Sequence, residues 1–343
     1  MVTNFQASRW SKLTIHFILR NVKINVKMKK LKNFSLIIII VGLLLLASTL
    51  GAWYVTKSLA EKETARLFND EVNIVESWIT NRFEFYKTIV FGLQAYWAGG
   101  EVVTKEEWQV YASTLKIKER FPGITSISFV KRVDDNYIVT FVYPPEREAA
   151  IGVNLITQPG RLEVINKAIE TASPAITDKV FLLADQKPGF VMYAPLYKKG
   201  LPTNTVEEKR TATQGLVTIA FRSEQVFKDL FDARDTFPHL DFELYKGTIL
   251  EDEYILYDHD YAFYIRKGED RKRLETKRLM TTNGETFTLL VAPKPSFGLK
   301  TLEKQLPNIV LIFGLVFSFL FFLFAFSEFQ KLEKKEKKWK DLN

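Results

Sequence analysis

The residues of this 343-residue chain best suited to chemistry are two short acidic clusters, Glu251–Glu253 and Asp258–Asp260. The second cluster includes His259, so six polar side chains lie within ten residues and offer oxygen and nitrogen ligands to a divalent cation. A solvated hairpin edge, with Tyr254–Tyr257 as a strand, explains the same pattern, because acidic residues are common in turns. A metal-dependent hydrolase is therefore the minor alternative, and we predict no metal site.

Other catalytic patterns are absent from the sequence. The three histidines, His16, His239 and His259, form no arrangement typical of a Ser/His/Asp or Cys/His nucleophile. The chain has no cysteine, which excludes disulfides, thiolate nucleophiles and Cys-ligated zinc. Phosphate-binding loops, G-x-S-x-G and H-E-x-x-H are also missing. We predict that the protein is not an enzyme and that it needs no cofactor.

Two long uncharged segments determine where the rest of the chain lies relative to a membrane. Residues 34–55 are 22 residues without a charge, and 309–326 form a second run of 18. At a rise of 1.5 Å per residue, the first run spans roughly 33 Å, enough to cross the hydrocarbon core of a bilayer. A buried core helix or a signal peptide is the alternative for each run. We predict two transmembrane helices in the plasma (inner) membrane.

The net charge of +8 is unevenly distributed and indicates an orientation. Residues 1–33 carry eight cations and no acid, and residues 328–343 carry six cations against four acids, whereas residues 34–327 are close to neutral. Because cations flank membrane spans on the cytoplasmic side, we expect both termini in the cytoplasm and residues 57–308 outside it. The near-neutral middle disfavours nucleic acid as a partner. Met28 precedes a membrane-targeting pattern, so residues 1–27 are a candidate upstream extension.

The outer region begins with a predicted stalk helix over residues 56–100. Its apolar residues recur at steps of three and four, which is helical spacing with a near-heptad seam: Phe68, Val72, Val75, Ile79, Phe83, Tyr86, Ile89, Leu93 and Trp97. Such a seam can pack on a second copy of the helix, on the domain beyond it, or on both. We expect a homodimer through the stalk helix, and the alternative is a helix that lies on its own domain without dimerising.

The remainder predicts an α+β fold in two units. A capping box at Thr104 opens a helix that continues to about Arg120. Strands and helices then follow, with strands expected at 124–130, 137–143, 175–183, 190–196, 216–221, 241–245, 274–280 and 286–292, and helices at 159–171 and 223–233. We assign residues 101–235 to a membrane-distal unit and residues 236–305 to a membrane-proximal unit. Residues 309–326 and a short basic tail, 328–343, complete the chain.

In this order, the segments resemble the CHASE domain, the extracytoplasmic sensor of bacterial receptors and of plant cytokinin-receptor histidine kinases. The similar stretches are FPGITSISFVKRV (121–133), IGVNL (151–155), GFVMYAPLY (189–197) and a loop from Leu201 to Arg210 that leads into QGL (214–216). The resemblance extends from the stalk to the second span. It implies a long helix carrying two PAS-like units, with a ligand pocket in the distal one.

The resemblance also implies pocket residues. Cytokinin receptors recognise the adenine ring with a carboxylate, and the matching position here is Asn154, which carries no charge and therefore argues against cytokinin. The same alignment puts Ile176, Thr177 and Tyr193 at the pocket wall, where Tyr193 replaces a smaller residue and narrows the cavity or offers a stacking face. The alternatives are a hydrogen-bonded turn residue for Asn154 and a core aromatic for Tyr193.

Function follows as two hypotheses from different classes. The first is a membrane-anchored sensor that binds a small molecule or peptide in the distal unit. Receptors of this type continue into a kinase or cyclase, and we expect this chain to lack such an output domain and to signal through a separate partner. The second is an envelope ligand-binding or assembly protein without a signalling role. A truncated remnant of a sensor histidine kinase or diguanylate cyclase is a further alternative.

Overall fold

The computed structural model describes residues 4–99, 103–231, 237–258, 276–282 and 284–341. It contains two long helices, α1 (Asn4–Gly99) and α7 (Thr301–Asp341), and both are long and apolar enough to cross a membrane. The two runs predicted as spans lie inside these helices. Large apolar side chains there, such as Leu44 and Phe313, are exposed, which is the surface that a span presents to lipid.

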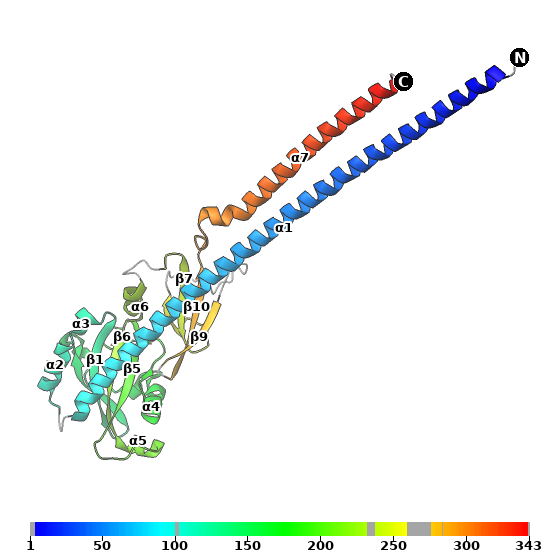
Figure 1. Cartoon of the computed structure of the whole chain (residues 1–343). Coiled ribbons are helices and arrows are strands. Elements are labelled where there is room, and N and C mark those ends of the chain that lie inside the picture. Colours follow the sequence, from blue (N-terminus) through cyan, green and yellow to red (C-terminus); the bar gives the residue numbers. More distant parts are fainter. Residues whose placement is uncertain (1–3, 100–102, 232–236, 259–275, 283, 342–343) are drawn as a thin grey trace. The chain divides into compact units, whose positions relative to one another are not determined.

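The chain forms two compact units. One comprises Met1–Arg66 and Gly298–Asn343, and the other is Leu67–Phe297. The second, which we call the globular unit, contains the C-terminal part of α1 and all the strands (Figure 1). Its range includes residues 101–235, the predicted distal unit, and residues 236–297 of the predicted proximal unit, whose last residues, 298–305, fall in the other compact unit.

The first sheet of the globular unit is antiparallel, with the order β2-β1-β6-β5-β3 and with β4 paired to β5. Its strands are β1 (Ile124–Val133), β2 (Asn136–Tyr143), β3 (Ala175–Ile176), β4 (Val180–Phe181), β5 (Pro188–Tyr197) and β6 (Thr213–Phe221). The strand predicted over 175–183 is thus two short bridging segments rather than one strand.

The second sheet is also antiparallel, with the order β8-β7-β10-β9. Its strands are β7 (Leu240–Lys246), β8 (Ile255–Asp258), β9 (Thr276–Thr282) and β10 (Glu285–Pro293). The predicted hairpin of β9 and β10 is confirmed, with Gly284 at φ +71° in its turn, where a side chain would strain the backbone. Residues 274 and 275 of the predicted strand, and Asn283 of the turn, lie outside the described residues.

The remaining helices are short. They are α2 (Lys105–Thr114), α3 (Ile117–Arg120), α4 (Arg161–Thr171), α5 (Val206–Ala212) and α6 (Ser223–Phe231), with 3-10 turns η1 (Pro145–Ala150) and η2 (Leu155–Thr157). The capping box of Thr104 and Glu107 is confirmed, but the helix breaks before α3 because Lys116 takes φ 50°. A second capping box, Thr205 with Glu208, starts α5 where the sequence analysis expected a loop.

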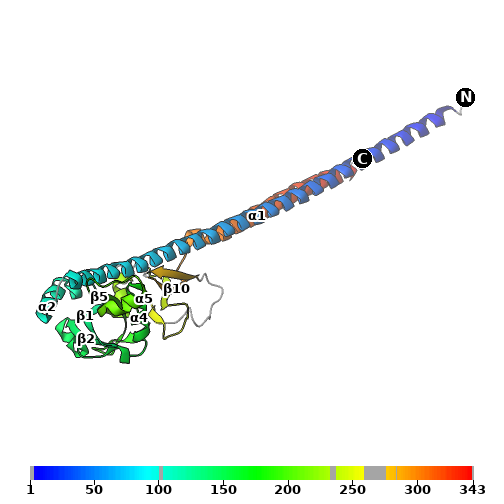
Figure 2. The ribbon, with the colours of Figure 1, turned by 90° about the horizontal axis from the view of Figure 1, so that it is seen from below.

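The core of the globular unit divides over the two faces of the first sheet. Along β5, Phe190 and Met192 belong to the cluster that includes α1 and the second sheet, whereas Val191 and Tyr193 belong to the cluster that includes α4. This alternation follows from the period of two in a strand whose faces are both covered. The C-terminal part of α1 runs along the strands in both views (Figure 1; Figure 2).

The apolar seam of α1 packs against the chain's own sheets. From Phe68 to Leu93 the seam residues are almost wholly buried, with Val90 taking the innermost position predicted for Ile89, which is half-buried. Phe83, for example, stacks on Phe287 of β10 at 4.6 Å between ring centroids. The expectation that this seam holds a partner helix is therefore corrected: its surface is already occupied, and a homodimer would have to use another face of α1.

Candidate functional site: a small cavity on the α4 face of the first sheet

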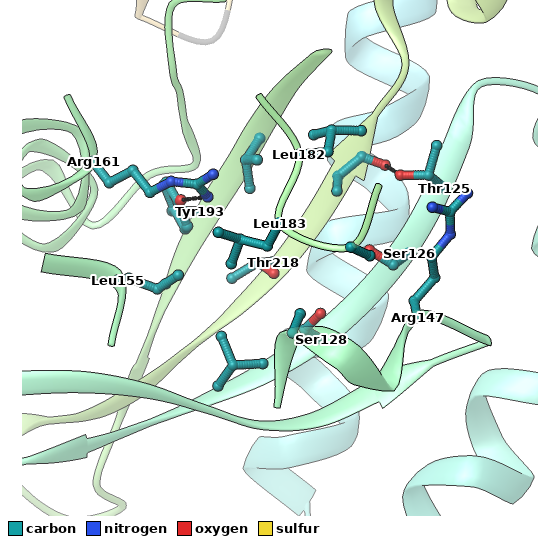
Figure 3. A pocket seen from close by; sticks show the side chains of 15 residues that line it. Thr125, Ser126, Ser128, Arg147, Leu155, Arg161, Leu182, Leu183, Tyr193 and Thr218 are labelled. Carbon is teal, nitrogen blue, oxygen red and sulfur yellow. Dashed lines mark hydrogen bonds between the residues drawn. The ribbon is translucent and has the colours of Figure 1, made fainter. Parts of the chain in front are cut away.

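A cavity of about 40 Å³ lies on the face of the first sheet opposite α1 (Figure 3). Strands β1, β2, β5 and β6 form its floor, and its other walls are residues of η1, η2, α4 and the segment Leu182–Ala184. A single water needs a cavity of roughly 10–15 Å³, so this cavity holds a few water-sized groups.

The floor of the cavity carries a row of hydroxyl groups. Ser128 of β1 is in register with Thr218 of β6, and Thr218 is in register with Tyr193 of β5, so the three side chains stand side by side. Ser126 lies two residues along β1. Among the described residues, the hydroxyls of Ser126, Ser128 and Thr218 have no hydrogen-bond partner. Because buried polar groups are normally paired, these hydroxyls are suited to water or a ligand.

Arg161 and Tyr193 meet at one side of the cavity (Figure 3). Arg161, the first residue of α4, is 3% exposed, and its Nη1 donates to Tyr193 Oη at 3.0 Å. Its Nη2 donates to the carbonyl oxygen of Phe181 at 3.2 Å. Burial raises the pKa of the Tyr193 phenol more than the charge of Arg161 lowers it. Tyr193 therefore stays protonated, and its own hydrogen is available to a ligand.

The segment that closes the cavity is tied down by Asp185. This carboxylate accepts a hydrogen bond from Arg147 Nη1 at 2.5 Å and another from Arg222 Nη2. Burial alone would raise the pKa of Asp185, but the hydrogen bonds from Arg147 and from the Lys187 N–H, with the charge of Arg222, outweigh it and hold the pKa below its usual value. The closing segment is thus joined to η1 on one side and to the residue after β6 on the other.

Of the four residues predicted for the pocket, only Tyr193 lines this cavity. Ile176 belongs to the cluster on the opposite face of the sheet. Thr177 is fully buried, but its Oγ1 accepts a hydrogen bond from the Val191 N–H at 3.0 Å and so serves the backbone. In β3 it is Ala175 that belongs to the cluster of α4, and Ile176 alternates to the opposite face.

The structure places Asn154 outside the cavity as well. Its Oδ1 accepts a hydrogen bond from the Tyr137 N–H at 3.2 Å, and its Nδ2 donates to Asn136 Oδ1 at 2.6 Å. It also caps η2 and forms an isolated bridge with Ile138 of β2. The amide is therefore committed to holding η2 against β2, and its neighbour Leu155 is the residue that reaches the cavity.

The acidic clusters are only partly described. Asp258 ends β8 and is buried, whereas His259 and Asp260 lie outside the described residues. In the part of the chain that the structure describes, no group of three or more His, Asp or Glu side chains is placed to hold a metal ion.

An ionic cluster around the buried Glu285 joins α4 to the second sheet. Glu285 of β10 is 3% exposed and forms ion pairs with Lys167 Nζ of α4 at 2.8 Å and with Lys246 Nζ of β7 at 3.4 Å. Lys246 also lies 3.5 Å from Asp178. The helix that begins with Arg161 is therefore anchored at its middle to the second sheet.

Sequence reasoning missed Arg161 and the serines of β1. A signal was present, because Ser126 and Ser128 alternate with Ile127 and Phe129 in a strand that is central to its sheet. In a strand covered on both faces, a polar series at period two marks a hydrated or ligand-facing row. That signal becomes readable only once the strand is known to be covered on both faces.

Comparison with family models gives one match within the globular unit. Residues 133–257 match the family model described as CHASE domain. This match covers less of the chain than the resemblance in the sequence, which extended from the stalk to the second span. Comparison with curated proteins finds no match.

Solved structures give the fold. The ligand-binding domain of the Pseudomonas fluorescens chemoreceptor CtaA in complex with L-serine superposes with a TM-score of 0.50 at 9% identity, over 68% of this chain and 98% of that one. The ligand-binding domain of the Pseudomonas aeruginosa chemoreceptor PctC in complex with GABA has a TM-score of 0.46 at 11% identity, and the match covers 68% of this chain and 99% of that one. An extracellular ligand-binding receptor from Desulfohalobium retbaense has a TM-score of 0.46 at 13% identity. That match covers 64% of this chain but only 39% of the receptor.

The mixed helix and sheet fold predicted for the outer region is thereby confirmed, and it is like the fold of a chemoreceptor ligand-binding domain. The resemblance seen in the sequence and the family match agree on the same segment: residues 133–257 of this chain match the CHASE domain.

Proposed function

We propose that this protein is a membrane-anchored extracytoplasmic sensor that binds a small molecule in the cavity between the first sheet and α4. The observation that carries the proposal is the row of hydroxyls on the cavity floor, formed by Ser126, Ser128 and Thr218, which line the cavity and have no hydrogen-bond partner among the described residues. Such hydroxyls can bond to water or to a ligand in the cavity, and each hydrogen bond contributes about 0.5–1.5 kcal/mol.

A ligand in this cavity has two routes to the rest of the globular unit. The first is β5, whose Tyr193 faces the cavity while the adjacent Met192 packs in the cluster of α1. The second is α4, which is fixed to β10 through Lys167 and Glu285. A ligand shifts such a structure only by its difference in affinity between two states, so movement of the closing segment or of α4 is the step that ligand binding would favour.

The anchoring and the partners belong to the same proposal. Two helices apolar enough to span, with cations beyond them, support a globular unit outside the membrane and both termini inside. A small organic ligand is supported by the sensor fold and by solved relatives whose complexes contain L-serine or GABA. Signalling would pass to a kinase or cyclase partner, and a homodimer would use a face of α1 other than the buried seam.

The proposal is tested with the full chain in detergent. A thermal-shift screen against carboxylates, amino acids, adenines and short peptides identifies a ligand, and Thr218→Val then removes one cavity hydroxyl at almost constant volume. We expect Thr218→Val to weaken binding about tenfold or more without lowering the stability of the unliganded protein. The control is Thr213→Val, which loses a hydrogen bond from Oγ1 to the Lys209 carbonyl and should lower stability without affecting the ligand. Binding unchanged by Thr218→Val would contradict the site.

A further inference from the structure

The guanidinium of Arg161 is a buried charge without an anionic partner. It uses two of its five N–H donors, on the Tyr193 hydroxyl and the Phe181 carbonyl, and among the described residues no carboxylate lies within ion-pair distance. Burying an ion without a counter-charge is costly, so buried cations in proteins are normally paired with an anion. Figure 3 shows this guanidinium beside the Tyr193 hydroxyl, among the residues that line the cavity.

The rest of the lining adds no negative charge. Among the described residues around the cavity, the charged side chains are Arg147 and Arg161, and no acid lines it. Arg147 and Arg222 share the single carboxylate of Asp185, so this group of three keeps an excess of one positive charge. With Arg161, the surroundings of the cavity are net positive, and among the described residues of the lining no carboxylate is available to an ammonium group.

The size and donors of the cavity narrow the ligand further. Three hydroxyls and the Tyr193 hydrogen surround a volume of about 40 Å³. A guanidinium presents parallel N–H donors that match the two oxygens of a carboxylate. We infer that the cavity binds a short monocarboxylate of two to four carbons, held by Arg161 and the hydroxyl row, an assignment that rests on the proposed function of this cavity.

This chemistry separates closely matched probes. Acetate, propionate and L-lactate should stabilise the full chain in detergent, whereas acetamide and propionamide, of the same shape without the charge, should not. L-alanine should bind more weakly than L-lactate, because its ammonium finds no acid in the lining. Hexanoate should bind more weakly than propionate, since a cavity of about 40 Å³ cannot hold its longer chain. All samples carry equal ionic strength in sodium chloride, so that screening is constant.

Variants tie the effect to the residue. Arg161→Met keeps much of the side-chain volume and should weaken propionate binding at least about 30-fold, the effect of truncating one partner of a buried charge pair. The control, Arg120→Met, removes an exposed arginine of α3 outside the cavity and should leave binding unchanged. If Arg161→Met does not fold, Thr218→Val provides a second test, because the Thr218 hydroxyl that it removes has no hydrogen-bond partner among the described residues.

The outcomes separate the two proposals. If amides bind as tightly as carboxylates, or if amino acids or inorganic phosphate bind best, the monocarboxylate assignment is wrong while a ligand-binding cavity stands, provided that Thr218→Val weakens the ligand that binds. If neither Arg161→Met nor Thr218→Val changes the affinity of the best ligand, or if no probe binds, both proposals fail.

Discussion

At the scale of single residues, the cavity depends on a tyrosine hydroxyl that accepts one hydrogen bond and can donate another. Tyr193 is fully buried, accepts a hydrogen bond from Arg161 and stands next to Thr218 across the sheet. Its phenol stays neutral because burial raises its pKa. The same oxygen therefore positions the guanidinium and can still donate its hydrogen into the cavity.

Replacing Tyr193 with Phe should lower the free energy of unfolding by about 1–3 kcal/mol, since a buried guanidinium loses an acceptor. The measurement is chemical unfolding of the full chain in detergent, together with ligand affinity, which should also fall. Tyr197→Phe is the matched control: its hydroxyl donates to the Ile169 carbonyl at 2.8 Å and does not line the cavity. It should affect stability but not affinity. Equal loss of affinity in both variants would contradict a specific role for Tyr193.

Asp185 gives the closing segment a dependence on pH. Its pKa in the folded protein is held below the ordinary value of about 3.9, so its stabilising contribution is present above that value and is lost as pH falls through the lower, folded pKa. We expect the stability difference between the natural protein and Asp185→Asn to be constant from pH 7 to about 5 and to shrink below about 4. Thermal unfolding across this range measures it.

The control for Asp185 is Asp135→Asn, in which an exposed turn carboxylate, 99% accessible, is replaced. Its stability difference from the natural protein should be small at neutral pH, because exposed ion pairs contribute little. A difference for Asp185→Asn that does not change down to pH 3 would mean that the carboxylate does not hold the closing segment through its charge.

At the scale of elements, α1 is the central core helix of the globular unit. Phe83 stacks on Phe287 of the second sheet and lies 6.1 Å, between ring centroids, from both Phe190 of the first sheet and Phe227 of α6. One side chain of α1 thus contacts both sheets. A change in either sheet would therefore alter the packing of the same helix.

Phe83→Ala should destabilise the globular unit by about 3–5 kcal/mol, the cost of a large buried aromatic truncated to a methyl group. Phe85→Ala, on the exposed side of the same helix and 47% accessible, should cost less than about 1 kcal/mol. Urea unfolding followed by tryptophan fluorescence measures both. If Phe83→Ala changed the oligomeric state and left stability unaltered, the seam would hold a partner helix after all.

At the scale of the whole molecule, the absence of cysteine allows a direct test of orientation. A single cysteine at Lys199, exposed between β5 and α5, should react with a membrane-impermeant maleimide in intact cells. A cysteine at Lys334, exposed near the end of α7, should react only after the membrane is permeabilised. The reverse pattern, or labelling of both sites in intact cells, would contradict the proposed topology.

Much of this architecture could be predicted from the sequence, because it depends on local periodicity. Uncharged length predicted the apolar segments of α1 and α7, steps of three and four predicted the buried residues of α1 from Phe68 to Leu93, and alternation predicted most strands. The ordered similarity of several stretches predicted the CHASE domain. Each of these properties is carried by neighbouring residues and needs no knowledge of what packs on them.

Only the tertiary structure decided what each face meets. The seam of α1 is apolar whether its partner is another chain or its own sheets, and the sheets occupy it. The amide of Asn154 is equally suited to binding a ligand and to capping η2. In the structure it accepts hydrogen bonds from backbone N–H groups and caps η2. Arg161, Tyr193 and Ser128 are far apart in sequence and meet because strand register and the placement of α4 bring them to one face. Periodicity shows that a face is buried, and contacts between distant segments determine against what.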